Sequence, residues 1–328
     1  MKALRKITFK KMKKIYSSQI LMTLALMLLA FDGFSQQDPQ YTQYMYNMSV
    51  INPAYATAKQ GILNIGGLYR AQWVGIKGGP RTGTFFVHTP INEKIEVGIS
   101  FVNDNIGDIV SENNVFADFA YILQVDDKSK ISLGLKAGVT MFDTDFSGFN
   151  LQSGDVSTDI AFNENINKAF PNLGIGGFYF GENYYAGLSI PNLLTTKHLE
   201  TENGIKSTGV QDIHFFLTGG YVFDFINDLK LKPAVMVRGV KGAPLAVDLT
   251  ANVLINQKLE AGIGYRLDDS VSALVNFRVR PDLRIGYAFD YTTSNLSSYN
   301  SGSHELFVLF DVDLFGLQNK YDRSPRFF

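Results

Sequence analysis

The chain has 328 residues, with 30 Lys+Arg against 31 Asp+Glu, and 45% of its residues are hydrophobic and 13% aromatic. This composition excludes a disordered chain. It contains no cysteine, which excludes disulfide scaffolds, thiolate zinc sites, thiol catalysis and a lipid anchor on an N-terminal cysteine.

Residues 1–35 are predicted to be a signal peptide. Four lysines between positions 10 and 14 precede an apolar run at 20–31, and the small residues Gly33 and Ser35 suit cleavage after Ser35. The alternative is a transmembrane anchor, but a run of about a dozen residues is shorter than the roughly 20 that span a bilayer. Without this segment 23 basic and 30 acidic side chains remain, a net charge of −7. That charge gives no electrostatic reason to bind nucleic acid.

Residues 36–60 form the next segment, whose first half combines tyrosines, a methionine and several amides. A disordered leader is the alternative, but this composition is too aromatic for a merely flexible tail. We therefore expect a packed segment, and Tyr41, Tyr44 and Tyr46 are candidate partner-binding residues.

Residues 61–315 are predicted to be strands, because apolar and polar residues alternate over runs of about ten. From 271 to 279, for example, the odd positions read Val, Ala, Val, Phe, Val, and the even positions between them read Ser, Leu, Asn, Arg. We count about 14 such runs, near 62–72, 81–89, 95–104, 113–124, 130–142, 172–180, 184–190, 212–225, 229–239, 244–254, 259–267, 271–280, 283–291 and 304–314.

These runs indicate an all-β protein of the outer-membrane type: a transmembrane antiparallel β-barrel of about 14 strands. Runs of about ten residues match the length that a tilted strand needs to cross an outer membrane. A soluble sandwich or barrel also alternates, but its water-facing side would not carry so many Gly, Ala, Phe and Leu. In a barrel, residues 36–60 would plug the lumen or hold the periplasmic rim.

The connections support this architecture. Even-numbered connections are short and turn-like, as at 91–94 and 281–282, whereas the odd-numbered ones include all the long segments, near 105–112, 143–171, 191–211 and 292–303. Outer-membrane barrels have tight periplasmic turns and long external loops. An even strand number then predicts that both termini are periplasmic, with residues 316–328 as a periplasmic tail.

The face opposite the apolar one would line the lumen, because an Arg or Lys facing lipid at the midplane costs roughly 2–4 kcal/mol. We expect a cross-bracing network of mixed charges there, rather than an ion-selectivity surface. The candidate lumen charges are Lys136, Arg238, Asp248, Glu260, Arg266, Arg278, Arg280, Arg284, Asp290 and Asp311.

The sequence predicts no catalytic residue, no metal site and no cofactor. The four histidines lack ligand-like spacing, and no nucleophile–base motif is present. Loop carboxylates could hold calcium but lack EF-hand spacing, and a glycine cluster at 174–177 resembles a phosphate loop without its helix. The histidines are His88, His198, His214 and His304, and the carboxylates are Asp143, Asp145, Asp155 and Asp159.

Short motifs spread over the mature chain resemble the PorP/SprF family of outer-membrane proteins, which belong to the type IX secretion system of Bacteroidetes. The two most distinctive are the opening block at 36–47 and the Gly-Ser-His-Glu stretch at 302–305. The matching stretches are 36–47, 52–56, 70–75, 80–82, 88–90, 104–107, 301–305 and 324–328.

The resemblance implies a non-enzymatic role in export or cell-surface retention of a secreted partner, such as a gliding adhesin, recognised through its C-terminal domain. It also implies periplasmic ring components of the machinery as partners, besides the outer-membrane lipids. Arg323 and Arg326 of the C-terminal tail are candidate docking residues for a ring component. The alternative function is an outer-membrane channel for small hydrophobic molecules.

Overall fold

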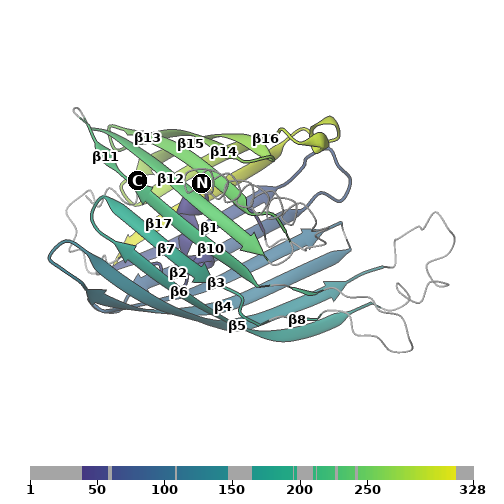
Figure 1. The fold of residues 1–328 in the computed structure, drawn as a ribbon, viewed down its shortest axis with the longest axis horizontal. Helices are drawn as coiled ribbons and strands as arrows, with labels where there is room; N and C mark the ends of the chain where they lie inside the picture. The colour runs from purple at the N-terminus through teal and green to yellow at the C-terminus, as the bar shows by residue number, and fades with distance from the viewer. Residues whose placement is uncertain are drawn as a thin grey trace, which may run out of the picture.

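The computed structural model describes residues 39–57, 61–107, 109–146, 165–194, 196–197, 210–211, 213–225, 228–240 and 243–314. Within these ranges 14 antiparallel strands close into a barrel (Figure 1), which confirms the predicted architecture and strand number. In ring order they are β1 (Ile62–Ala71), β2 (Arg81–Pro90), β3 (Ile95–Ile106), β4 (Val110–Gln124), β5 (Lys130–Thr144), β6 (Asn167–Phe180), β7 (Tyr184–Ile190), β10 (His214–Tyr221), β12 (Leu229–Val240), β13 (Ala246–Ile255), β14 (Leu259–Arg266), β15 (Ser270–Arg280), β16 (Leu283–Thr292) and β17 (Ser303–Asp313).

The ring closes where the first and last strands pair. β1 runs antiparallel to β17, and β10 pairs with β12 on the other side of the barrel. The short β11 (Phe223–Asp224) adds to the end of β12, and β8 (Thr196–Lys197) pairs separately with β9 (Val210–Gln211). Among the described residues, no helix has the length and hydropathy that crossing a bilayer requires.

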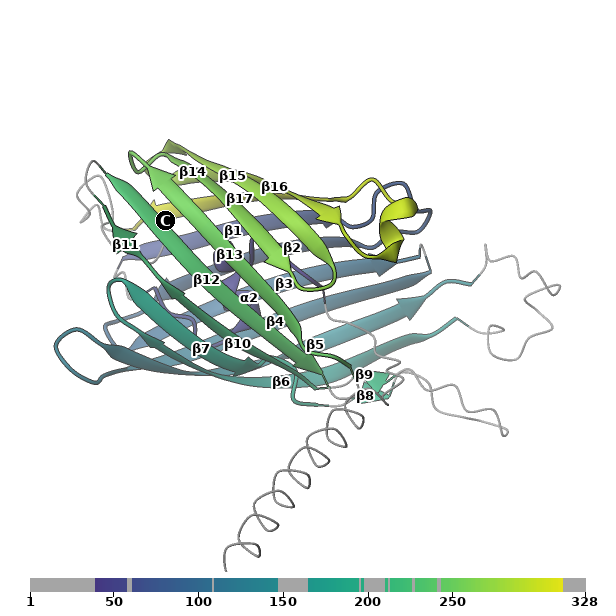
Figure 2. The same ribbon diagram turned by 45° about the horizontal axis from the view of Figure 1, so that its top comes forward.

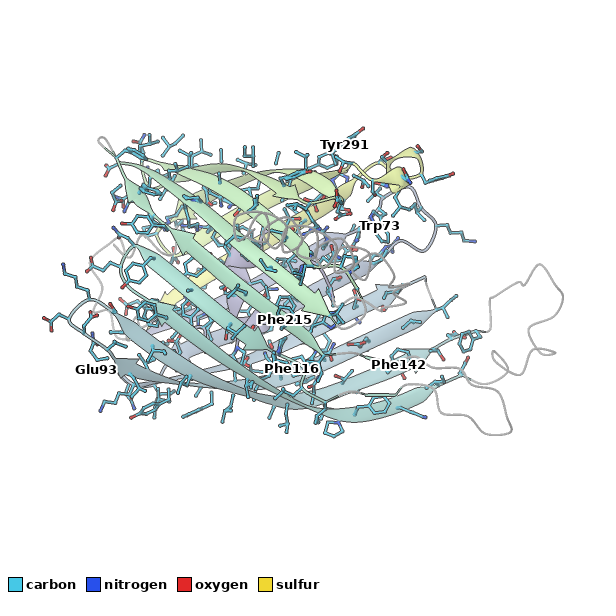
Figure 3. The ribbon with its side chains drawn as sticks, in the orientation of Figure 1. Trp73, Glu93, Phe116, Phe142, Phe215 and Tyr291 are labelled. Carbon is cyan, nitrogen blue, oxygen red and sulfur yellow. The ribbon has the colours of Figure 1, made fainter. Side chains whose placement is uncertain are left out.

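The two faces of the wall differ as the alternation predicts. On β15 the odd-numbered residues Val271, Val275 and Phe277 are exposed on the outside, while Ser272 and Asn276 between them are buried. Figure 3 shows side chains standing outward all along the wall. An apolar outside and a polar inside are the arrangement that a barrel in a bilayer requires, because lipid cannot solvate polar groups.

The two ends of the barrel also differ. We call the end with the connections 91–94, 125–129, 181–183, 256–258 and 281–282 the turn end, and the opposite end the loop end. In Figure 3 Glu93 lies at the turn end, and Trp73 and Tyr291 lie toward the loop end. In the turn at 125–129 the carboxylate of Asp126 accepts backbone N–H groups of Lys128 and Ser129, and the Lys128 bond above all lowers the pKa of Asp126.

Two predicted loops are shorter than expected. The stretch 105–112 is mostly strand, since β3 and β4 stay paired as far as Ile106 and Val110. The stretch 143–171 shrinks in the same way, because β5 extends to Thr144 and β6 begins at Asn167. At these strand ends the side chains are polar, as where Asn103 donates a hydrogen bond of 2.8 Å to Asn113. The alternation of apolar and polar residues therefore does not reveal the part of a strand that extends beyond its lipid-facing apolar residues.

Candidate functional site

Residues 39–57 pack against the inward-facing side chains of the barrel. This N-terminal segment contains one 3₁₀ turn, η1 (Tyr44–Tyr46), and one turn of α-helix, α2 (Met48–Ile51). Figure 2 shows α2, in purple, enclosed by the strands. The segment's apolar side chains form one buried cluster with barrel residues that include Phe178, Phe216 and Phe307.

The first polar anchor of the segment lies toward the loop end. The backbone N–H groups of Thr42 and Gln43 donate to the two carboxylate oxygens of Glu305, at 2.9 and 2.7 Å. The Thr42 hydroxyl donates to Asp290 and accepts from Arg70 Nη1 at 2.8 Å. Arg70 also pairs with Asp290 at 2.7 Å and Glu305 at 3.1 Å. Three buried charges from β1, β16 and β17 thus hold two consecutive residues of the segment.

A second polar anchor lies nearer the turn end, around Tyr46. Its hydroxyl donates to Glu260 and accepts from Arg284 Nη1 at 3.0 Å. The Tyr46 ring stacks on Phe307, with centroids 4.4 Å apart, and the ammonium of Lys232 lies 5.6 Å from the ring centroid. The tyrosine therefore links β12, β14, β16 and β17 through one side chain.

The end of the segment fits closely against the wall. Asn52 donates to the carbonyl of Gly177 at 3.1 Å. A Cβ at Gly134 would collide with the backbone of Pro53 and Ala54, so this approach requires glycine. Close contact of main chain with main chain leaves no room for water between segment and wall at this point.

The last anchor is a carboxylate near the turn end. Thr57 donates its backbone N–H to Glu96 at 2.9 Å and its hydroxyl at 3.0 Å. Glu96 also shares a hydrogen bond of 3.0 Å with His88 Nδ1. His88 therefore acts as a structural hydrogen-bonding residue.

Most of the predicted lumen charges are buried on the inner face. Lys136 pairs with Asp118 at 2.8 Å, and Asp248 pairs with both Arg238 and Arg266. The inward-facing residues that are buried are Lys136, Arg238, Asp248, Glu260, Arg266, Arg284 and Asp290, whereas Arg278 and Asp311 are half-buried. Asp311 accepts a hydrogen bond from Asn64.

Arg280 is an exception, because the prediction that it lines the lumen is wrong. A β-bulge between Arg278 and Arg280 shifts the register, so that Arg280 lies opposite Leu283. Its guanidinium sits 5.9 Å from the ring of the outward-facing Phe310 and pairs with exposed Asp282 at 2.9 Å. A bulge adds one residue to a strand and exchanges the faces beyond it, which alternation does not reveal.

The segment crosses the lumen from one end to the other. Gln40 accepts a hydrogen bond of 2.9 Å from Arg266, the last residue of β14 at the loop end. Leu314 donates to the carbonyl of Gly61 at the turn end. The first described residues therefore lie at the loop end and the last ones at the turn end, whereas the two termini themselves, predicted to be periplasmic, lie outside the described residues.

Two small cavities lie beside the first described residues of the segment. One has a volume of about 60 Å³ and is lined by Pro39, Tyr41, Phe216 and Arg238, among others. The other, of about 30 Å³, is lined by Gln40, His214, Phe216 and Arg238. Each would hold at most a few water molecules or one small side chain.

The candidate partner-binding residues divide into two groups. Tyr41, Tyr44 and Tyr46 are buried, and Tyr41 shares a hydrogen bond with Thr84. Arg323 and Arg326 lie outside the described residues, as do residues 1–35, His198 and the loop carboxylates Asp155 and Asp159. The described part of the chain contains no group of three or more His, Asp or Glu side chains placed to hold a metal.

A closed barrel with an apolar outside and a charged inner face defines an outer-membrane β-barrel protein. The chain belongs to the PorP/SprF family: the model described as "Type IX secretion system membrane protein PorP/SprF" matches residues 33–310. It is thus an outer-membrane component of that secretion system. The motif resemblance and the predicted location are confirmed.

Solved structures with this architecture are distant in sequence. The Acinetobacter baumannii outer membrane protein Omp33 is 9% identical, with a TM-score of 0.46, and the match covers 77% of this chain and 100% of that one. A Pseudomonas aeruginosa FadL homologue is 10% identical, with a TM-score of 0.47 and 81% and 94% of the chains covered. The Ralstonia pickettii toluene transporter TbuX is 13% identical, with a TM-score of 0.46 and 81% and 93% covered. No curated protein sequence matches the chain.

Proposed function

We propose that this barrel is a docking component of the type IX system, which assists export or surface retention of a secreted partner by binding the partner's C-terminal domain. One observation carries the proposal: residues 39–57 pack against the inner face of the barrel, with polar anchors at both ends and in the middle. A barrel occupied in this way has no role as the conduit for a folded protein. Its remaining surface for a large partner is the loop end.

The anchors supply enough free energy to keep the segment in place. Glu305, Asp290 and Glu96 together accept five hydrogen bonds from Thr42, Gln43 and Thr57. Hydrogen bonds to charged groups contribute about 1.5–3 kcal/mol each. In this proposal the segment acts as a permanent plug rather than as a gate that opens readily.

The burial of the three tyrosines changes the role that we propose for them in partner binding. Tyr44 and Tyr46 are buried against the wall, so their part in partner binding is indirect, through the position of the plug. Tyr41 lines the larger cavity at the loop end together with Arg238, where a side chain of the partner would meet it. The chain carries no catalytic role in this proposal.

The C-terminal tail 316–328, with Arg323 and Arg326, is proposed to dock a periplasmic ring component. β17 ends at Asp313 at the turn end, so the tail starts on the side opposite the long loops. Deletion of residues 316–328 is expected to abolish co-purification with ring components while the barrel still assembles. Unchanged co-purification would remove this part of the proposal.

A channel for small hydrophobic molecules is the competing function. Such a channel would require an apolar path, whereas the lumen wall beside the plug carries the buried ion pairs of Arg70, Lys136 and Arg266. The charged wall and the filled lumen support docking over conduction. Single-channel recording separates the two, because a docking component is expected to be electrically silent in planar bilayers.

The functional test is genetic. A strain without this chain is expected to lose the partner from its surface, measured by labelling surface proteins of intact cells and identifying them by mass spectrometry. Wild-type protein should restore the partner, and a variant with the loop-end cavity filled, Val50→Trp, should not. As a matched control, Leu135→Trp places the same side chain on the exposed outer face and should restore it. An unchanged surface proteome in the deletion strain would contradict the proposal.

A further inference from the structure

The direction in which the N-terminal segment runs has a topological consequence. Position along the strands gives the height of each contact, because neighbouring strands of the ring run in opposite directions. The strands β1, β3, β5, β7, β12, β14 and β16 start at the turn end, and the strands between them start at the loop end. Side chains at matching ends of the strands therefore lie at the same rim. Each wall residue that the segment contacts therefore lies at a known height between the two rims.

The segment's first described residues lie at the loop-end rim. Gln40 is bound by Arg266, and the same guanidinium pairs at 3.2 Å with Asp269 in the connection between β14 and β15. Gln40 also lines the smaller cavity beside Ala243 and Pro244, which belong to the connection between β12 and β13. Both connections are at the loop end.

The segment's last residues lie at the other rim. Thr57 is bound by Glu96, the second residue of β3, which starts at the turn end. A few residues further on, the chain enters the wall at Ile62, the first residue of β1. Between the two rims Thr42 contacts Asp290 near the loop end of β16, and Tyr46 contacts Glu260 near the turn end of β14. Val50 and Ile51 then line the cavity that Pro39 and Tyr41 also line, before the segment reaches Glu96.

The length of the segment is sufficient for this path. A strand of ten residues rises about 33 Å, and a tilt of roughly 40° reduces the height of the wall to about 25 Å. The 17 residue steps from Gln40 to Thr57 could extend to about 55–60 Å. The helical turns η1 and α2 shorten the segment, so its contour length still reaches from one rim to the other.

We infer that the processed N-terminus of this chain threads through its own barrel and emerges at the outer mouth, on the side of the membrane opposite to the C-terminal tail. The orientation follows from the long connections 145–166 and 191–213 at the loop end, since outer-membrane barrels carry long loops outside and tight turns inside. Cleavage after Ser35 leaves three residues before Pro39, which reach at most about 11 Å beyond it. The N-terminus is thus part of the surface that an extracellular protein meets.

Threading also constrains assembly. The N-terminus must pass along the lumen before or while β1 pairs with β17, or afterwards as a free end. A folded domain fused ahead of Gln36 could not follow this path through a lumen of 14 strands. The same domain fused after Phe328 meets no such barrier.

The absence of cysteine makes the topology directly measurable. Single-cysteine variants Gln37→Cys and Asn319→Cys report the two termini to a membrane-impermeant maleimide added to intact cells. Ser153→Cys in the connection 145–166 is the external control. Ser49→Cys, at a buried position of the segment, is the control for a lumenal site.

The inference predicts that Gln37→Cys reacts on intact cells at a rate within about threefold of Ser153→Cys. Asn319→Cys should react only after the outer membrane is permeabilised, and Ser49→Cys only after the protein is denatured. Reaction of Gln37→Cys only after permeabilisation would overturn the inference, as would reaction of Asn319→Cys on intact cells. Both outcomes are independent of whether a secreted partner binds, so failure here is distinct from failure of the docking proposal.

Discussion

Thr42 offers the sharpest test of how the plug is held. Its hydroxyl donates to Asp290 and accepts from Arg70, and all three side chains are buried. Thr42→Val preserves shape but removes both hydrogen bonds to charged groups. At about 1.5–3 kcal/mol for each such bond, with partial compensation by the remaining Arg70–Asp290 pair, we expect a loss of about 2–4 kcal/mol. The open population of the segment should then rise about 30- to 900-fold.

Hydrogen–deuterium exchange of the peptide covering residues 39–57 measures this directly in the detergent-solubilised protein, since exchange requires local opening. Ser49→Ala is the matched control: Ser49 is also buried, but its hydroxyl has no hydrogen-bond partner among the described residues, so its removal should leave protection unchanged or increased. If protection in Thr42→Val stayed within twofold of wild type, the polar anchor would not be what holds the segment.

Two further substitutions test the wall. Gly134→Val should displace the segment and increase exchange in the same peptide, because the added Cβ would collide with the segment's backbone. Gly83→Ala is the control and should be neutral, because its Cβ meets nothing within 4 Å. Equal protection of the peptide in both variants would refute the close contact. Lys136→Met leaves Asp118 buried without its partner and should destabilise the barrel by about 3–5 kcal/mol in denaturant unfolding. Arg280→Gln removes an exposed ion pair and the contact with the Phe310 ring, and should cost about 1 kcal/mol or less. Similar losses for the two variants would contradict the buried network.

Alternation was sufficient to predict the barrel, because membrane strands need an apolar face at every second residue. The runs around Val271 and Leu306 match β15 and β17 closely. The same argument fails where the wall leaves the apolar band. Asn103 and Asn113 continue the ladder with polar side chains, and the bulge before Arg280 exchanges faces without changing the composition of the strand.

The plug was predictable as a packed segment but not in its path. Its tyrosines and amides indicate burial, yet no periodicity tells which wall residues they meet. The pairing of Thr42 with Asp290 and of Tyr46 with Glu260 joins residues more than 200 positions apart. Such contacts follow from the closed ring, so the direction of the segment, and with it the side on which the chain emerges, required the three-dimensional structure.

The central claim is that this barrel is a closed docking component for a secreted protein. The most direct test is purification of the tagged protein from its own outer membrane in mild detergent, with mass spectrometry of what accompanies it. The account predicts recovery of a large secreted protein that carries a type IX C-terminal domain, in amounts close to those of the barrel. A barrel that purifies without such a protein and conducts ions in planar bilayers would contradict it.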